Sequence, residues 1–88
     1  MKKPEDQAPW IPAKYDLPDA TAMKALEKGE ANAHQQKMAL RWIIETVAKT
    51  YDLSYRLNDR DTAFAEGKRF VGLQIVKLLN LPLSNLKS

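Results

Sequence analysis

Proline is confined to the two ends of this 88-residue chain, and this distribution is the strongest constraint on its fold. Four of the five prolines lie within the first 18 residues, and the fifth is Pro82. Because proline lacks a backbone donor and biases the preceding residue towards extended geometry, residues 1–16 are predicted to form an extended N-terminal arm. Trp10, Ile11 and Tyr15 lie among these prolines, so the arm is expected to dock on the chain's own helices or on another subunit.

The region between the prolines has the periodicity of helices and no alternation typical of a strand. Three helices are predicted, near residues 17–28, 33–51 and 60–80. Asp16 and Asn32 are expected to cap the first two, and Gly29 to end the first. The predicted fold is therefore all-α: a small three-helix domain at 17–80, with an extended Pro-rich N-terminal arm at 1–16 and a C-terminal tail at 81–88.

Two apolar stripes predict the core of this domain. They occupy the second and third helices at spacings of three and four residues, so their centres are expected to face one another. The predicted core residues are Leu40, Ile44, Val47, Phe64, Val71, Ile75 and Leu78. Met38 and Trp42 project from a different side of the second helix, and the arm's Trp10 and Ile11 are the expected cover.

The third helix is apolar over most of its circumference, which indicates burial on more than one side. It also contains Gly67 and Gly72, each of which costs about 1 kcal/mol relative to alanine inside a helix. Close approach of another backbone is the expected reason for these glycines. Because three helices cannot cover every apolar flank, contact with a partner or a second copy is predicted at Trp10, Phe70, Gly72, Leu73 and Val76.

The charge distribution offers a weaker, alternative indication of nucleic-acid binding. The net charge is +3 and the pI is near 9.3. Residues 1–30 carry a net charge of −1 and residues 31–88 a net charge of +4. These bases are interleaved with acids, so internal pairing competes with phosphate contact. The candidate nucleic-acid contacts are Lys37, Arg41, Arg56, Arg60, Lys68 and Arg69.

Several classes of function are disfavoured by composition. The chain has no cysteine and a single histidine, His34, so thiol chemistry and Cys- or His-rich metal sites are excluded. No nucleophile, base and orienting group can be assembled, and no catalytic, cofactor-binding or metal-binding residue is predicted. No apolar run is long enough to cross a membrane, and the N-terminus lacks the apolar segment of a secretory signal.

Residues 60–75 read Arg-Asp-Thr-Ala-Phe-Ala-Glu-Gly-Lys-Arg-Phe-Val-Gly-Leu-Gln-Ile. This string resembles a family of small tailed-phage proteins, of podophage type, that carry an Arg-x-x-Ala-Phe-x-x-Gly-x-Arg-x-x-Gly core. The stretch at 25–31, Gln35-Gln36 and Trp42-Ile43-Ile44 also fit. The resemblance covers roughly residues 15–80 and implies a bacteriophage gene among head-assembly, portal and terminase genes. The family supplies no catalytic role, so the resemblance narrows the context more than the mechanism.

Two main functions follow as hypotheses. The first is a non-enzymatic phage structural or virion-assembly protein, which self-associates or binds a phage protein through the third helix and the Trp10 arm. The alternative is a DNA-binding packaging factor resembling a small terminase subunit; an inhibitor of a host protein also stays open. No cofactor and no membrane are expected, and the protein is expected in the host cytoplasm or the virion.

Overall fold

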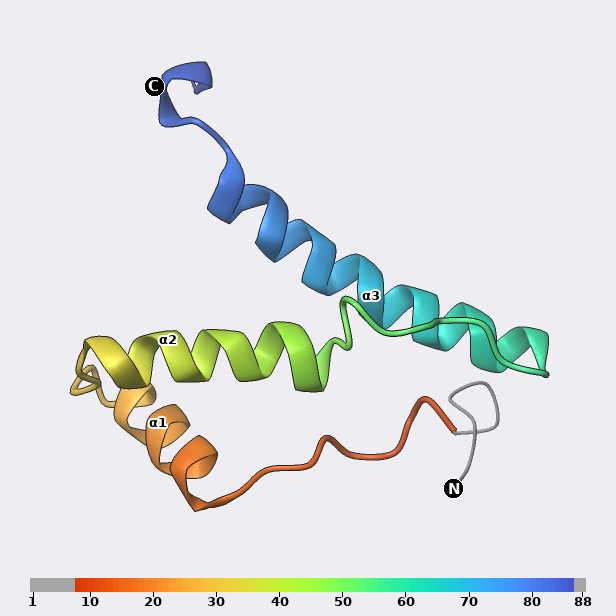
Figure 1. Cartoon of the computed structure of the whole chain (residues 1–88), viewed down its shortest axis with the longest axis horizontal. Helices are drawn as coiled ribbons and strands as arrows, with labels where there is room; N and C mark the ends of the chain where they lie inside the picture. Colours follow the sequence, from red (N-terminus) through yellow and green to blue (C-terminus); the bar gives the residue numbers. More distant parts are fainter. Residues whose placement is uncertain (1–7, 87–88) are drawn as a thin grey trace.

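The computed structural model describes residues 8–86 and has three α-helices and no strand in that range (Figure 1). Helix α1 spans Leu17–Glu27, α2 spans Ala33–Arg41, and α3 spans Asp59–Asn80. A π-helical segment, η2, continues α2 over Trp42–Val47, and a 3₁₀ turn, η3, spans Leu83–Asn85. The predicted all-α, three-helix fold is confirmed. Residues 1–7 of the predicted arm and 87–88 of the predicted tail lie outside the described residues, so the arm as a whole stays a prediction.

The helices begin where their capping residues predict. Asp16 and Asp19 form a capping box at α1, in which each backbone N–H donates to the other's carboxylate. Asn32 and Gln35 form the equivalent box at α2. Gly29 follows α1 with φ +72°, a left-handed conformation that costs glycine little.

The second helix ends earlier than predicted, and its last turns are widened. The N–H of Ala48 donates to the carbonyl of Ile43, and the N–H and hydroxyl of Thr50 both donate to the carbonyl of Ile44. Lys49, between them, has φ 50°. The chain therefore leaves the helical path at Val47, not near residue 51, because side-chain and wide-turn bonds satisfy the last carbonyls.

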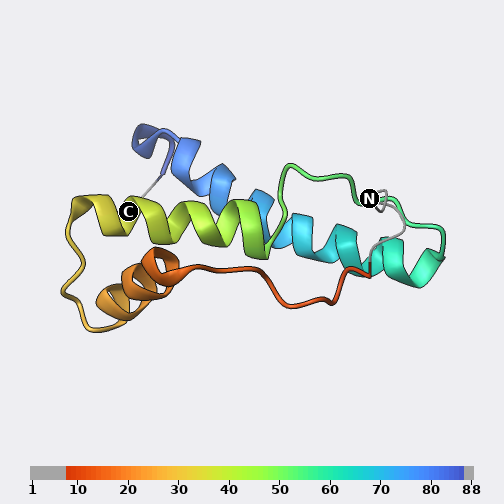
Figure 2. The same cartoon turned by 60° about the horizontal axis from the view of Figure 1, so that its bottom comes forward.

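The helices make an open, flat molecule of 41 × 38 × 17 Å (Figures 1 and 2). Its Cα radius of gyration is 15.4 Å, against about 12 Å for a compact domain of this length. Helix α1 packs against α2, and α3 packs against η2. The C-terminal half of α3 projects away from the other helices (Figure 1).

The buried core is built of small side chains, and the predicted core is wrong for the third helix. Phe64, Val71 and Leu78 are 49%, 57% and 69% exposed. A different flank of α3, which includes Ala65 and Gly72, is the one that is buried. Ile44 is buried as predicted, Leu40 and Ile75 are half-buried, and Val47 is at the edge of exposure. The buried apolar residues are Ala22, Ala39, Ile44, Ala48 and Ala65.

The flank of α3 that contains Gly72 is the buried one because α3 closely approaches the end of η2 there. A Cβ at residue 72 would overlap the Thr50 hydroxyl and lie 2.9 Å from Thr50 Cβ and 3.0 Å from Ala48 Cβ. Only glycine therefore fits at this crossing. The predicted close approach at Gly72 exists, but it is made within the chain.

Candidate interaction surface

Residues 8–16 run beside η2 and the N-terminal half of α3 (Figure 2). Two hydrogen bonds hold this segment in place. Lys68 Nζ donates to the carbonyl of Pro9 at 2.8 Å, and Trp42 Nε1 donates to the carbonyl of Lys14 at 2.9 Å. A segment far from α3 in sequence thus becomes part of the surface around it.

Trp10 packs on α3 and not on the second helix as predicted. Its ring lies edge-to-face with that of Phe64, with centroids 6.4 Å apart and an interplanar angle of 81°. Trp42, the predicted partner of Trp10, instead donates a hydrogen bond from its indole N–H to the carbonyl of Lys14. The prediction that Trp10 covers Met38 and Trp42 is therefore wrong. The arm lies against α3 at Trp10 and reaches Trp42 only at Lys14.

An open apolar groove of about 360 Å³ lies between the arm, η2 and α3. Its walls are apolar on three sides: Trp10 and Ile11, then Ile43 and Val47, then Phe64 and Val71. Trp10 and Ile11 are 59% and 56% exposed. The groove is continuous with the exposed side of α3 because Phe64 and Val71 belong to both.

The exposed side of α3 extends beyond the groove along the projecting half of the helix. Leu78, seven residues after Val71, continues this side and is 69% exposed, and the neighbouring Phe70 is 61% exposed. Leu79, 58% exposed, lies on the opposite side of the helix from Phe70. Clustered large apolar side chains of this kind are typical of protein-binding surfaces.

The five predicted partner contacts do not all lie on this surface. Trp10, Phe70 and Leu73 are exposed, and Val76 is half-buried. Gly72 is buried against Thr50 of the same chain, so its predicted contact with a partner is wrong.

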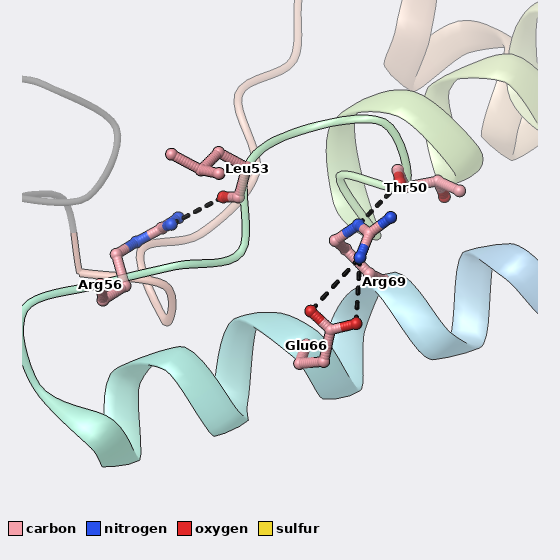
Figure 3. A network of polar contacts seen from close by, with 5 residues as sticks. All are labelled: Thr50, Leu53, Arg56, Glu66 and Arg69. Atoms are coloured by element: carbon pink, nitrogen blue, oxygen red, sulfur yellow. Dashed lines mark hydrogen bonds and ion pairs between the residues drawn. The ribbon is translucent and has the colours of Figure 1, made fainter.

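Two arginines of the predicted basic cluster bind the chain's own carbonyl groups (Figure 3). Arg56 is 5% exposed and donates from Nη1 to the carbonyls of Leu53 and Tyr55, at 2.7 and 2.9 Å. Arg69 donates from Nε to the carbonyl of Thr50 at 3.0 Å, and from Nη1 to the Glu66 carboxylate at 3.0 and 3.3 Å. The Arg56 guanidinium therefore braces the 50–58 loop internally, and that of Arg69 ties Thr50, where this loop begins, to α3.

The four other basic candidates are distributed over the molecule. Lys68 is half-buried, and burial, with Lys49 and Arg56 nearby, lowers the pKa of its ammonium group. Lys37 and Arg41 lie exposed on α2, where Arg41 is 3.8 Å from Glu45. Arg60 is exposed in the first turn of α3. The six candidates are therefore split between α2, α3 and the 50–58 loop.

A second hollow, of about 350 Å³, lies beside α2 and has mixed walls, with Met38 and Trp42 among several polar side chains. It is lined by His34, Lys37, Arg41 and Glu45 of α2 and η2, together with Asp19 of α1. Asp19 is engaged in the α1 capping box and Arg41 in the ion pair with Glu45. This hollow was not predicted from sequence, although the three- and four-residue spacing of the polar groups on α2 and η2 indicates one helix face.

Neither a group of potential metal ligands nor a helix able to span a membrane occurs within residues 8–86. Comparisons with protein-family models, curated proteins and solved structures find no match. The groove and the exposed side of α3 are therefore the features on which a functional proposal rests.

Proposed function

We propose that this chain is a non-enzymatic assembly protein that self-associates or binds a protein partner through α3 and the adjoining groove. The observation that carries this proposal is the exposure of Phe70 and Leu78 on a helix whose contacts with η2 and with the arm leave this side uncovered. The resemblance to small tailed-phage proteins would place such a role in phage assembly.

The architecture supports this proposal. An isolated small domain normally gains its stability by burying its large apolar side chains. Here four of the five buried apolar residues of the core are alanines, whereas the phenylalanines and most leucines are exposed. A covering protein would convert this exposed apolar area into binding free energy.

The engagement of the basic groups disfavours the packaging-factor alternative. Arg56 and Arg69 donate to carbonyls of their own chain, and the pKa of Lys68 is lowered. Binding phosphate would compete with the bonds by which Arg56 and Arg69 hold the 50–58 loop and Lys68 holds the arm. Protein contact therefore remains the favoured proposal.

Sedimentation velocity across about 1–100 µM chain, with and without duplex DNA, tests the proposal. We expect the mass to rise above 10.0 kDa with concentration, unaffected by DNA. Replacing Phe70 and Leu78 together with serine should weaken association, because both lie on the same exposed side of α3. Leu17→Ser is the matched control, because Leu17 is 78% exposed on α1, away from this surface.

A chain that stays at 10.0 kDa and binds duplex DNA with a steep salt dependence would overturn the proposal in favour of the packaging factor. Equal effects of the α3 and Leu17 variants would remove α3 as the contact surface.

A further inference from the structure

The apolar groove between the arm, η2 and α3 contains one charged side chain, that of Lys68. Phe64, Lys68 and Val71 follow one another at spacings of four and three residues, so they line the same side of α3. Lys68 therefore lies between the two apolar residues of the α3 wall. The other walls are apolar groups of the arm and η2, and no aspartate or glutamate of residues 8–86 lines the groove.

The Lys68 ammonium group is only partly satisfied. It donates to the carbonyl of Pro9 at 2.8 Å, which uses one of its three N–H groups. The three ion pairs between described side chains do not include Lys68. Burial lowers the pKa of this ammonium group, because a charge in apolar surroundings without a counter-ion is unfavourable. A negative group supplied from outside the chain would remove this cost.

The surroundings of Lys68 are basic beyond the groove itself. Another hollow, of about 320 Å³, shares Pro9 and Ile11 of the arm with the groove. Its charged residues within the described chain are all basic: Lys14, Lys49 and Arg56. Two of these, Lys49 and Arg56, act on the Lys68 ammonium and outweigh the opposing charge of Asp52. The field at the groove therefore favours an anion over a neutral or cationic group.

We propose that the groove binds an alkyl carboxylate, a small molecule with an apolar body and one anionic head. The body lies against Trp10, Phe64 and Val71, and the carboxylate accepts hydrogen bonds from the two remaining N–H groups of Lys68. A groove of about 360 Å³ has the size of a small-molecule site. Phe64 and Val71 are about 10 Å apart along the helix axis, which suits a chain of medium length.

Charge complementarity distinguishes this ligand class from its neighbours. An alkylammonium ion would place like charges together, and an alcohol would leave the Lys68 charge without a counter-ion. Such a ligand fills the groove whether or not a protein covers α3, so this inference goes beyond the proposed function.

NMR titration of the full chain with octanoate, octylammonium and 1-octanol tests the proposal below micelle-forming concentrations. We expect octanoate to shift the Trp10 indole N–H and Val71 methyl signals saturably, with intermolecular NOEs from its methylenes to Val71. Octylammonium and octanol should bind at least about tenfold more weakly, because they lack the charge-assisted hydrogen bonds. Equal binding of the three ligands would overturn the proposal.

A carboxylate placed in the groove wall tests the site without touching Lys68. Val71 is 57% exposed, so Val71→Glu should leave the fold intact while pairing with Lys68 three residues away. We expect octanoate to bind at least about tenfold more weakly to this variant, and less than about threefold more weakly to Val71→Gln. Leu78→Glu is the matched control, because it makes the same charge change on the same side of α3 outside the groove. Its affinity for octanoate should stay within about twofold of the original.

Lys68→Met tests the ammonium group itself. Octanoate should then bind no more tightly than octanol, whereas octanol binding should change by less than about twofold. Because Lys68 also holds Pro9, octanol binding reports whether the groove is still formed. Val71→Glu keeps the test decisive if Lys68→Met releases the arm.

The outcomes separate the ligand site from the proposed function. Octanoate contacts confined to α1 and α2, or equal losses in Val71→Glu and Leu78→Glu, would overturn the ligand site. A chain that associates in sedimentation but does not prefer octanoate would overturn the ligand site alone. A chain that stays monomeric and binds octanoate as expected would support the ligand site and contradict self-association.

Discussion

Two neighbouring parts of α3, the crossing at Gly72 and the C-terminal end beyond Val76, are packed in opposite ways. Around Gly72 the helix backbone lies against Thr50 and Ala48, so the side chains at the contact are small. Beyond Val76 the same helix carries Leu78 and Leu79, both more than half exposed. The close approach of the α3 backbone to Thr50 and Ala48, and not the size of its apolar side chains, therefore decides which part of α3 packs within the single chain.

Polar bonding reinforces the packed half. Thr50 is fully buried, its hydroxyl donates to the carbonyl of Ile44 at 2.7 Å, and its own carbonyl accepts from Arg69. Every buried side-chain nitrogen or oxygen in the described part of the chain has a hydrogen-bond partner. At the crossing, close steric fit is therefore combined with satisfied hydrogen bonds, whereas the projecting C-terminal end of α3 is exposed and available for other contacts.

Adding one methyl group to each glycine of α3 in turn tests most directly whether the helix is closely packed at Gly72 and open at Gly67. Gly72→Ala forces the new Cβ against Thr50, and we expect a loss of about 2–3 kcal/mol in the free energy of unfolding. Gly67→Ala meets no atom and should add up to about 1 kcal/mol through helix propensity. Urea denaturation at low protein concentration measures both, and equal stabilities would show that α3 does not cross η2 at Gly72.

Arg56 tests whether the loop before α3 depends on an internal guanidinium. Arg56→Met removes the donor for the Leu53 and Tyr55 carbonyls in a buried site, and we expect a loss of about 2 kcal/mol. Arg60→Met, at an exposed position four residues later, is the matched control and should change stability by less than about 0.5 kcal/mol. If the two variants unfolded alike in urea, Arg56 would not be structural.

The predictable parts of this fold are those determined by local chemistry. The capping boxes at Asp16 and Asn32 and the left-handed stop at Gly29 depend on neighbouring residues, so the helices begin and the first one ends where sequence predicts. The choice of core flank depends on how closely α3 approaches Thr50. Hydrophobic periodicity favours the Phe64–Leu78 stripe because it weighs side-chain size and contains no information on interhelical distance.

The same distinction applies to the interaction surface. The exposure of Phe70 and Leu73 could be predicted, because the sequence shows that α3 has more apolar flanks than three helices can cover. The internal bonds of Arg69 and Lys68 depend on carbonyls brought near by the 50–58 loop and the arm. Sequence spacing identified these bases as a cluster but could not identify their partners.

Lys49 offers a way to strengthen the packed half. Its φ of 50° places a side chain in the left-handed region, where glycine has no Cβ penalty. Lys49→Gly should therefore raise the unfolding free energy by about 1 kcal/mol, even though it removes the 3.8 Å ion pair with Asp52. Lys28→Gly, at a right-handed position after α1, is the control and should not stabilise the chain. A loss of stability in Lys49→Gly would contradict this backbone argument.

The smallest expected effect concerns the Glu66 carboxylate, which links the packed crossing to solvent. Hydrogen bonds from Ser54 and then Arg69 lower the pKa of Glu66 below its ordinary value of 4.5. A carboxylate with a lowered pKa stabilises the fold above the unfolded-state pKa, and this contribution is lost as pH falls through the folded-state pKa. Glu66→Gln should therefore be slightly less stable than the original at pH 7, and the difference should vanish in acid. Thermal melts from pH 7 to pH 3 measure this convergence, with Glu27→Gln on α1 controlling for the loss of one negative charge. A gap that persists at pH 3 would mean that Glu66 contributes through packing and not through its charge, and that Arg69 holds the crossing by its bond to Thr50 alone.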